Sequence, residues 1–322
     1  MKTITVQKVF SDLRDSLDID LLTDMPEDDV VLEASDLHRP GMALMGFMAN
    51  FLPGRIQVIG ESEMEYLGTL DYGGQQAALT RLRELQAPAV FVTHGHTVPE
   101  SILAAARAEG IPVFGTSMPT VEFMRALAEH LHRLFAPRTE IHASLVDVYG
   151  VGMLFTGKSG IGKSECSLDL VERGHRLVAD DIVEVVKRGD EVIVGRFREV
   201  LQHNIEIRGV GVIDVQAIYG IRGIRMQKRI EVEVHLQPWS DDADYERTGL
   251  EREYSEILGV KVPRIVVPIV PGKNLTVIAE VIALDFMLKI YGVDAARDLN
   301  RRIMESLQSG DRLRRYLRHD NE

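Results

Sequence analysis

The sequence of 322 residues is poor in cysteine, in positive charge and in long apolar segments. Its single cysteine, Cys166, excludes an intramolecular disulfide and fits a reducing compartment. Acidic residues outnumber basic ones by 49 to 37, and the net charge of -12 disfavours binding to nucleic acid or to an anionic membrane. Residues 42–52, the most apolar early stretch, are too few to span a bilayer, and residues 1–10 lack the apolar core of a signal peptide. We therefore expect a cytoplasmic protein that binds neither nucleic acid nor membrane.

The length of the chain predicts two domains, because single hydrophobic cores seldom extend beyond about 250–300 residues. Over the first 135 residues, short apolar runs alternate with segments whose apolar residues have helical spacing. The pattern predicts strands at residues 55–59, 89–92 and 111–114, and helices at residues 75–85, 99–109 and 120–134. Short buried strands that alternate with helices predict an N-terminal α/β domain, residues 1–135, with a largely parallel sheet.

The remaining residues, 136–322, have a different pattern and predict a second domain. Residues 136–139 have the composition of a linker, and residues 141–148 and 151–155 predict a hairpin with its turn at Tyr149 and Gly150. Residues 182–236 are rich in strand patterns, and a polar loop is expected at 240–253. Helices are expected at 277–291 and 295–308.

The second domain contains a complete phosphate-binding motif, G-x-x-x-x-G-K-[ST]. Its residues are Gly157, Lys158, Ser159, Gly160, Ile161, Gly162, Lys163 and Ser164. A predicted strand at 153–156 precedes the motif and a predicted helix at 165–173 follows it, which is the context that such a loop requires. Glycines let backbone N–H groups turn toward phosphate oxygens, Lys163 adds a positive charge, and Ser164 offers a hydroxyl to Mg²⁺. The motif therefore predicts binding of a nucleoside triphosphate.

Two aspartates, Asp180 and Asp181, end a short apolar run one helix after the loop. A right-handed crossover sets the end of that strand beside the phosphates. One carboxylate is expected to orient the metal and one to deprotonate an attacking hydroxyl, and the pattern leaves open which does which. A triphosphate site beside a general base is typical of a kinase.

Other charged residues near the motif have two interpretations. His142 lies on the predicted strand before the loop, where a lone histidine is more often structural than catalytic. Glu206 interrupts the apolar run 205–214, whose two glycines are unusual for a purely structural strand. Arg247 lies in the expected polar loop and Lys273 in a stiff loop with two prolines, and each either contacts an anion or faces solvent.

Four blocks in this order and spacing resemble the HPr kinase/phosphorylase family, bacterial enzymes that phosphorylate a serine of the phosphocarrier protein HPr. The blocks are residues 142–152, 157–165, 172–181 and 206–214, and weaker matches at 39–46, 55–60 and 268–274 extend the resemblance over nearly the whole chain. The resemblance implies a C-terminal P-loop kinase domain, residues 136–322, of the phosphoenolpyruvate-carboxykinase-like type. It also implies a homohexamer, in which the N-terminal domain serves regulation or assembly.

The resemblance further implies roles for single residues. Residues 157–164 are expected to bind ATP, or pyrophosphate as an alternative donor, while Ser164 and Glu206 are expected to bind Mg²⁺. Asp181 is expected to act as the base in phosphorylation. It is expected to act as the acid in the reverse reaction, in which inorganic phosphate attacks phosphoserine-HPr and gives pyrophosphate. His142, Lys163 and Arg247 complete the expected active site.

The chain departs from the family pattern at Ala143, where a glycine is usual, at Lys273, where an arginine is usual, and over residues 282–286. Because lysine cannot form a bidentate fork with phosphate, Lys273 predicts a weaker phosphorylase activity. Two other functions fit the same motif. One is a P-loop kinase that acts on another protein or a small metabolite, and the other is a non-catalytic nucleotide sensor.

Overall fold

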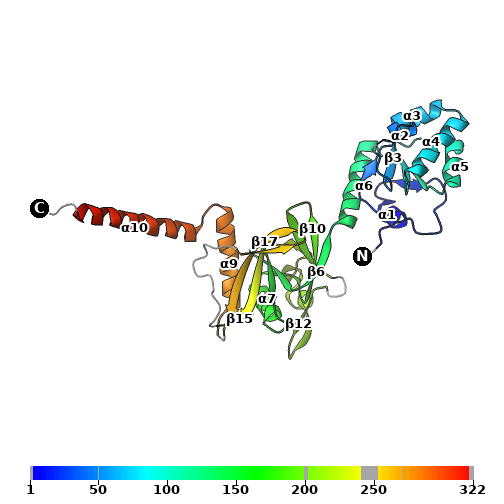
Figure 1. Ribbon diagram of the computed structural model, residues 1–322. Coiled ribbons are helices and arrows are strands. Elements are labelled where there is room, and N and C mark those ends of the chain that lie inside the picture. Colours follow the sequence, from blue (N-terminus) through cyan, green and yellow to red (C-terminus); the bar gives the residue numbers. More distant parts are fainter. Residues whose placement is uncertain (1–2, 50, 199–201, 241–252, 271, 319–322) are drawn as a thin grey trace. The chain divides into compact units, whose positions relative to one another are not determined.

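The computed structural model describes residues 3–49, 51–198, 202–240, 253–270 and 272–318 (Figure 1). The chain divides into two compact units, Met1–Ala136 and Pro137–Glu322. Both units combine helices with sheets, which confirms the predicted α/β fold class. Among the described residues, no helix is long and apolar enough to cross a bilayer.

The N-terminal unit is built on a five-stranded sheet with the strand order β1-β5-β4-β3-β2. Four strands run parallel, as predicted, and one edge strand is antiparallel. The parallel strands are β2 (Leu37–His38), β3 (Ile56–Ile59), β4 (Val90–Val92) and β5 (Val113–Thr116), and the antiparallel one is β1 (Ile19–Leu21).

Helices cover both faces of this sheet, because successive side chains of a buried strand point to opposite faces. Val58 and Phe91 lie in one core, which α1 (Val6–Leu13) and α6 (Thr120–Phe135) cover. Ile59 and Val92 lie in the other core. That core is covered by α2 (Gly41–Leu44), α3 (Glu61–Thr69), α4 (Tyr72–Glu84) and α5 (Glu100–Ala108).

The C-terminal unit is built on a six-stranded sheet with the order β16-β17-β15-β8-β7-β9. Its strands are β7 (Ser144–Val148), β8 (Val151–Gly157), β9 (Arg176–Ala179), β15 (Val232–Pro238), β16 (Glu253–Ile257) and β17 (Val260–Ile269). β8, β15 and β17 are parallel, whereas β7 runs antiparallel to both β8 and β9. β8 and β9 therefore point the same way, and their C-terminal ends lie at one edge of the sheet.

Each face of the six-stranded sheet has its own cover. On one face it packs against α7 (Lys163–Glu172) and α9 (Leu275–Ile290) around Val146, Phe155 and Leu170. On the other face Leu145 and Leu154 pack against a four-stranded antiparallel sheet of order β14-β11-β10-β6. Its strands are β6 (Arg138–His142), β10 (Ile182–Arg188), β11 (Val192–Phe197) and β14 (Gln227–Arg229).

Among the described residues of this unit, the remaining elements are a separate hairpin and three helices. The hairpin consists of β12 (Asn204–Ile207) and β13 (Gly211–Asp214). The helices are α8 (Val215–Tyr219), the short 3₁₀ helix η2 (Ile221–Gly223) and α10 (Ala295–Arg318).

Two predictions about this region need correction. The boundary between the units lies within the linker expected at 136–139, but that linker is shorter than expected, because β6 starts at Arg138. The single strand expected at 141–148 is two strands, because His142 pairs with Ile182 in one sheet whereas Ser144 pairs with Phe155 in the other. The predicted turn is correct: Tyr149 (φ 51°) and Gly150 (φ 87°) have the two positive φ angles of a type I′ hairpin turn.

Candidate active site

The phosphate-binding loop joins β8 to the N-terminus of α7. At its start, Gly157 has a φ of 138° and lies so close to the carbonyl oxygen of Leu236 on β15 that a Cβ has no room. Gly160 has a φ of 74°, and a Cβ there would lie 2.5 Å from a guanidinium nitrogen of Arg208. Both positions therefore require glycine, which holds the loop against its neighbours.

The ammonium group of Lys163 turns back over this loop. It donates to the carbonyl oxygens of Gly157 (3.2 Å) and Lys158 (3.3 Å), and it lies 3.4 Å from Nε2 of His142. Lys163 is only 6% exposed, so its charge is held in place and acts through little water. A fixed positive charge beside a nest of backbone N–H groups is suited to binding phosphate.

Asp180 is a buried carboxylate that faces the start of α7. Its oxygens accept hydrogen bonds from the hydroxyl groups of Ser164 (2.8 Å) and Ser144. Burial raises the pKa of Asp180, and the two hydroxyl groups partly offset that effect by stabilising the charged form. The Ser164–Asp180 pair thus places a hydroxyl and a carboxylate side by side next to the phosphate loop.

Asp181 faces a different environment from its neighbour in sequence. Its side chain is 54% exposed, and one carboxylate oxygen lies 3.1 Å from Nδ1 of His142. The same ring nitrogen lies 2.9 Å from the backbone oxygen of Asp181. The positive φ of Asp181, 64°, turns the chain here and allows the two adjacent carboxylates to point to different partners. An exposed carboxylate oriented by a histidine is suited to exchange a proton with an incoming hydroxyl.

These groups line one cavity of about 120 Å³. It brings together the predicted residues His142, Ser159, Gly160, Gly162, Lys163, Ser164, Asp181 and Glu206. Ile161 instead packs against the hydrophobic core under the loop. Lys273 is not among the residues that line the cavity, and its ammonium group donates to the carbonyl oxygen of Pro268. Arg247 lies outside the described residues.

Three further residues line the site or hold it together. Arg208 and Glu165 line the cavity, and Ser144 anchors Asp180 from β7. Arg208 carries the second charge of the unusual run 205–214, so its sequence signal was present beside that of Glu206. Ser144 has no such signal, because a serine on a strand is common and its partner is 36 residues away.

The donor set of the cavity fits Mg²⁺. Ser164 and Asp180 offer a hydroxyl and a carboxylate oxygen in direct contact, and Glu206 adds a second carboxylate. The described residues contain no cluster of three His, Cys, Asp or Glu side chains that could enclose a metal alone. This arrangement suits Mg²⁺, which is usually bound by one or two carboxylates together with substrate phosphates.

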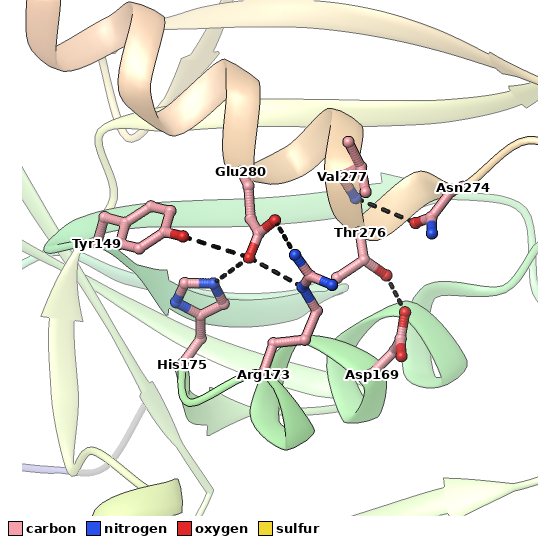
Figure 2. Close-up of polar contacts among 8 residues, drawn as sticks. All are labelled: Tyr149, Asp169, Arg173, His175, Asn274, Thr276, Val277 and Glu280. Carbon is pink, nitrogen blue, oxygen red and sulfur yellow. Dashed lines mark hydrogen bonds and ion pairs between the residues drawn. The ribbon is translucent and has the colours of Figure 1, made fainter.

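Behind the phosphate loop, a buried carboxylate ties α9 to the loop helix α7 (Figure 2). Glu280 of α9 accepts two hydrogen bonds from Arg173 (2.9 and 2.5 Å) and lies 3.1 Å from Nε2 of His175. The hydrogen bonds from Arg173, supported by His175, lower the pKa of Glu280 to about 2. One turn earlier on α9, Thr276 donates to Asp169 of α7. The helix that presents Lys163 and Ser164 is therefore held by two polar contacts with α9.

Comparisons with known proteins bear on the family to which the chain belongs. Two family models match the chain: HPr Serine kinase N terminus over residues 4–131, and HPr Serine kinase C-terminal domain over residues 133–303. A protein of Chloroherpeton thalassium named HPr kinase/phosphorylase is 42% identical over 330 residues, which cover 100% of this chain and 97% of that protein. One of the same name from Geobacillus thermodenitrificans is 39% identical over 281 residues, 87% of this chain and 91% of that protein.

Among solved structures, the Hpr(Ser) kinase/phosphatase from Coxiella burnetii is 31% identical, with a TM-score of 0.45. The match covers 50% of this chain and 98% of that one. The family models and the full-length relatives confirm the resemblance predicted from the sequence: the chain belongs to the HPr kinase/phosphorylase family.

Proposed function

We propose that this enzyme transfers the γ-phosphoryl group of ATP to a serine of HPr and catalyses the reverse phosphorolysis of phosphoserine-HPr. The observation that carries the proposal is the exposed, histidine-oriented carboxylate of Asp181 in the cavity of the phosphate loop. A hydroxyl acceptor needs a base within reach, and the exposure of Asp181 leaves room for a serine carried by another protein.

In the forward direction Asp181 accepts the proton of the serine hydroxyl. The serine oxygen attacks the γ-phosphorus, the bond to the bridging oxygen breaks, and ADP leaves. Lys163 and Arg208, which line the cavity, are proposed to neutralise charge on the transferred group, and His142 is proposed to hold Asp181 in position. Arg247 is proposed to add a further positive charge.

Ser164, Asp180 and Glu206 are proposed to hold Mg²⁺. Ser164 and Asp180 already contact one another beside the phosphate loop, so they form the fixed half of this site. The ion would supply positive charge that offsets the negative charge of the donor phosphates. The division of labour between the aspartates follows from their surroundings: Asp180 is buried against Ser164, and Asp181 is open to the acceptor.

The reverse reaction uses the same groups. An oxygen of inorganic phosphate attacks the phosphorus of phosphoserine-HPr, the bond to the serine oxygen breaks, and Asp181 returns the proton to that oxygen. The products are HPr and pyrophosphate, which in the forward direction serves as an alternative donor. Lys273, which does not line the cavity, stands where the family usually has an arginine and lacks the planar fork of that residue, so phosphorolysis is expected to be the weaker activity.

The enzyme is proposed to act in the cytoplasm, where ATP is available, as a homohexamer. Apolar side chains exposed on α9 and α10 support self-association, since such surfaces are usually covered. They include Val281, Leu284, Leu288, Ile303 and Leu307. The N-terminal unit is proposed to serve regulation or assembly.

The test is an assay with purified HPr in both directions. With ATP and Mg²⁺ we expect one phosphate per HPr, located on serine by mass spectrometry, and none on an HPr whose acceptor serine is replaced by alanine. With phosphoserine-HPr and inorganic phosphate we expect pyrophosphate. Failure to phosphorylate HPr at saturating ATP, or equal transfer to a small hydroxyl metabolite, contradicts the proposal.

A further inference from the structure

The cavity beside Asp181 is too small for a whole nucleotide. Its volume of about 120 Å³ is below the range of about 300–1,000 Å³ that is usual for ligand pockets. Its lining is almost entirely polar or charged, with groups suited to phosphate and metal rather than to a base and a ribose. The nucleoside of a bound donor therefore needs a second space next to the phosphate loop.

Such a space lies on the other side of the start of the loop. A cavity of about 490 Å³ is lined by Lys158, His235, Leu236, Gln237, Pro238 and Ser240. Lys158 belongs to this cavity, whereas the next residue, Ser159, belongs to the phosphate cavity. Gly157 pairs with Leu236 across β8 and β15 and packs tightly against its carbonyl oxygen. The two cavities thus flank the same turn of the chain.

The order of the strands gives the direction in which a donor lies. β15 is on one side of β8, whereas β7 and β9 are on the other. Asp181, which follows β9, marks the end where the acceptor meets the terminal phosphate. A polyphosphate that passes over the loop from Asp181 therefore has its nucleoside end on the side of β15, where the larger cavity opens.

The chemistry of the cavity wall suits a heteroaromatic base. The hydroxyl of Thr156 donates its only hydrogen to Glu233 (2.5 Å), so its oxygen accepts from Nδ1 of His235 (2.9 Å). Burial and the nearby charge of Arg264 lower the pKa of His235, which favours the neutral ring. A neutral imidazole with its proton on Nδ1 offers an aromatic face and, at Nε2, a hydrogen-bond acceptor. Gln237, two residues along β15 on the same face, adds an amide that both donates and accepts.

We propose that the cavity lined by His235 and Gln237 at the end of β15 binds the nucleoside of the nucleoside triphosphate donor. The proposal rests on the proposed kinase function only for the direction of the donor. In this arrangement the phosphate loop alone binds pyrophosphate, whereas a nucleotide is bound by the loop and by β15 together.

The test compares two ligands that differ only in the part assigned to this cavity. Isothermal titration calorimetry on the full chain with Mg²⁺ measures the Kd of ADP and of pyrophosphate. Loss of one stacking partner for a base is expected to raise the Kd of ADP about tenfold in His235→Ala and to leave that of pyrophosphate within about twofold. His132→Ala, the same change at an exposed histidine of α6, is the control and should alter neither value.

A second variant covers the case in which His235→Ala disturbs the polar contacts of Thr156 and loses both ligands. Gln237→Trp reduces the volume of the cavity from its other wall, and it should weaken ADP while pyrophosphate binding persists. An unchanged Kd of ADP in both variants overturns the proposal, and so does an equal loss of ADP and pyrophosphate in both. Since no HPr is present, a chain that passes this test yet fails to phosphorylate HPr contradicts only the proposed function.

Discussion

The two units of this protein each contain parallel strands whose C-terminal ends meet the N-terminus of a helix, yet the two edges differ in what their polar groups do. In the N-terminal unit the groups are paired with one another. Glu63 accepts from the backbone N–H of Gly60 (3.1 Å) and from Arg39 (2.6 Å), and the hydroxyls of Thr93 and Thr120 are 2.7 Å apart. These contacts pair several polar groups of this edge with one another.

In the C-terminal unit the corresponding edge carries charges that converge on a cavity. Lys163, Asp181, Glu206 and Arg208 line the same space, although they come from three separate parts of the chain. Charges gathered in one place cost stability, and the proposed binding of phosphate and metal would offset that cost. The fold alone therefore does not identify the site. What distinguishes the two edges is whether their polar groups pair with one another or line a shared cavity.

The largest effect is expected at the edge of the C-terminal sheet that lines the cavity, called here the open edge; the corresponding edge of the N-terminal sheet is called the paired edge. Lys163→Met removes the fixed charge over the loop and should lower kcat/KM for HPr phosphorylation about 10³-fold, in line with the loss of a preorganised electrostatic contact. Steady-state kinetics with ATP measure it. Lys261→Met, at an exposed lysine of β17, is the matched control. A decrease in kcat/KM of less than tenfold for Lys163→Met would contradict the proposed role of the open edge in phosphoryl transfer.

The contacts behind the open edge should matter for stability. Glu280→Gln replaces a carboxylate that Arg173 and His175 share, and it should lower the free energy of unfolding of the C-terminal unit by about 2 kcal/mol. Urea unfolding followed by the fluorescence of Trp239, the only tryptophan, reports on this unit. Glu305→Gln on the exposed face of α10 is the control, and equal stability of the two variants would contradict the assignment.

The same carboxylate predicts a pH dependence. The pKa of Glu280 is lowered to about 2 in the folded chain from an ordinary value of 4.5, so its charged form is the one that folding favours. Its contribution is complete above pH 4.5 and is lost as the pH falls from 4.5 toward 2. The difference in unfolding free energy between the wild type and Glu280→Gln should therefore be constant near neutral pH and shrink below pH 4.5. A difference that grows on acidification argues against this origin.

The smallest effect is expected at the paired edge. A Cβ on Gly60 would lie 2.7 Å from the hydroxyl of Thr120 and 3.1 Å from the guanidinium of Arg39. Gly60→Ala should therefore destabilise the N-terminal unit by about 1 kcal/mol through overpacking, with little change in phosphoryl transfer. Gly68→Ala, on the same helix α3 but with open space around the new methyl group, should be neutral or slightly stabilising. Hydrogen exchange of the backbone amides of the N-terminal unit, measured at increasing temperature, distinguishes the two variants.

Local sequence signals predicted the α/β fold of the N-terminal unit and most residues of the candidate site. The loop motif, the run that ends in Asp180 and Asp181, and the alternation of strands and helices over the first 135 residues each lie within a short segment. The sequence left the roles of the two aspartates open because those roles depend on what surrounds each carboxylate. Asp180 is buried against Ser144 and Ser164, which lie 36 and 16 residues away.

The break between β6 and β7 was missed for a related reason. Apolar and polar residues alternate through most of residues 141–148, but this alternation does not reveal which partner strand each residue takes. At Ala143 the chain passes from one sheet to the other, and its N–H donates to the carbonyl oxygen of Asp181. The contact between Glu280 and Arg173 spans 107 residues and is likewise invisible to local patterns.

The role of Asp181 is the central claim, and single-turnover transfer from ATP to HPr by Asp181→Asn tests it most directly. Asparagine keeps the shape of the side chain but cannot accept the serine proton, so the rate should fall about 10³-fold. The Kd of ATP, measured by calorimetry, should stay close to that of the wild type, because Asp181 is assigned to the acceptor. Transfer at the wild-type rate, or a loss explained entirely by weaker ATP binding, would contradict the assignment of Asp181 as the base.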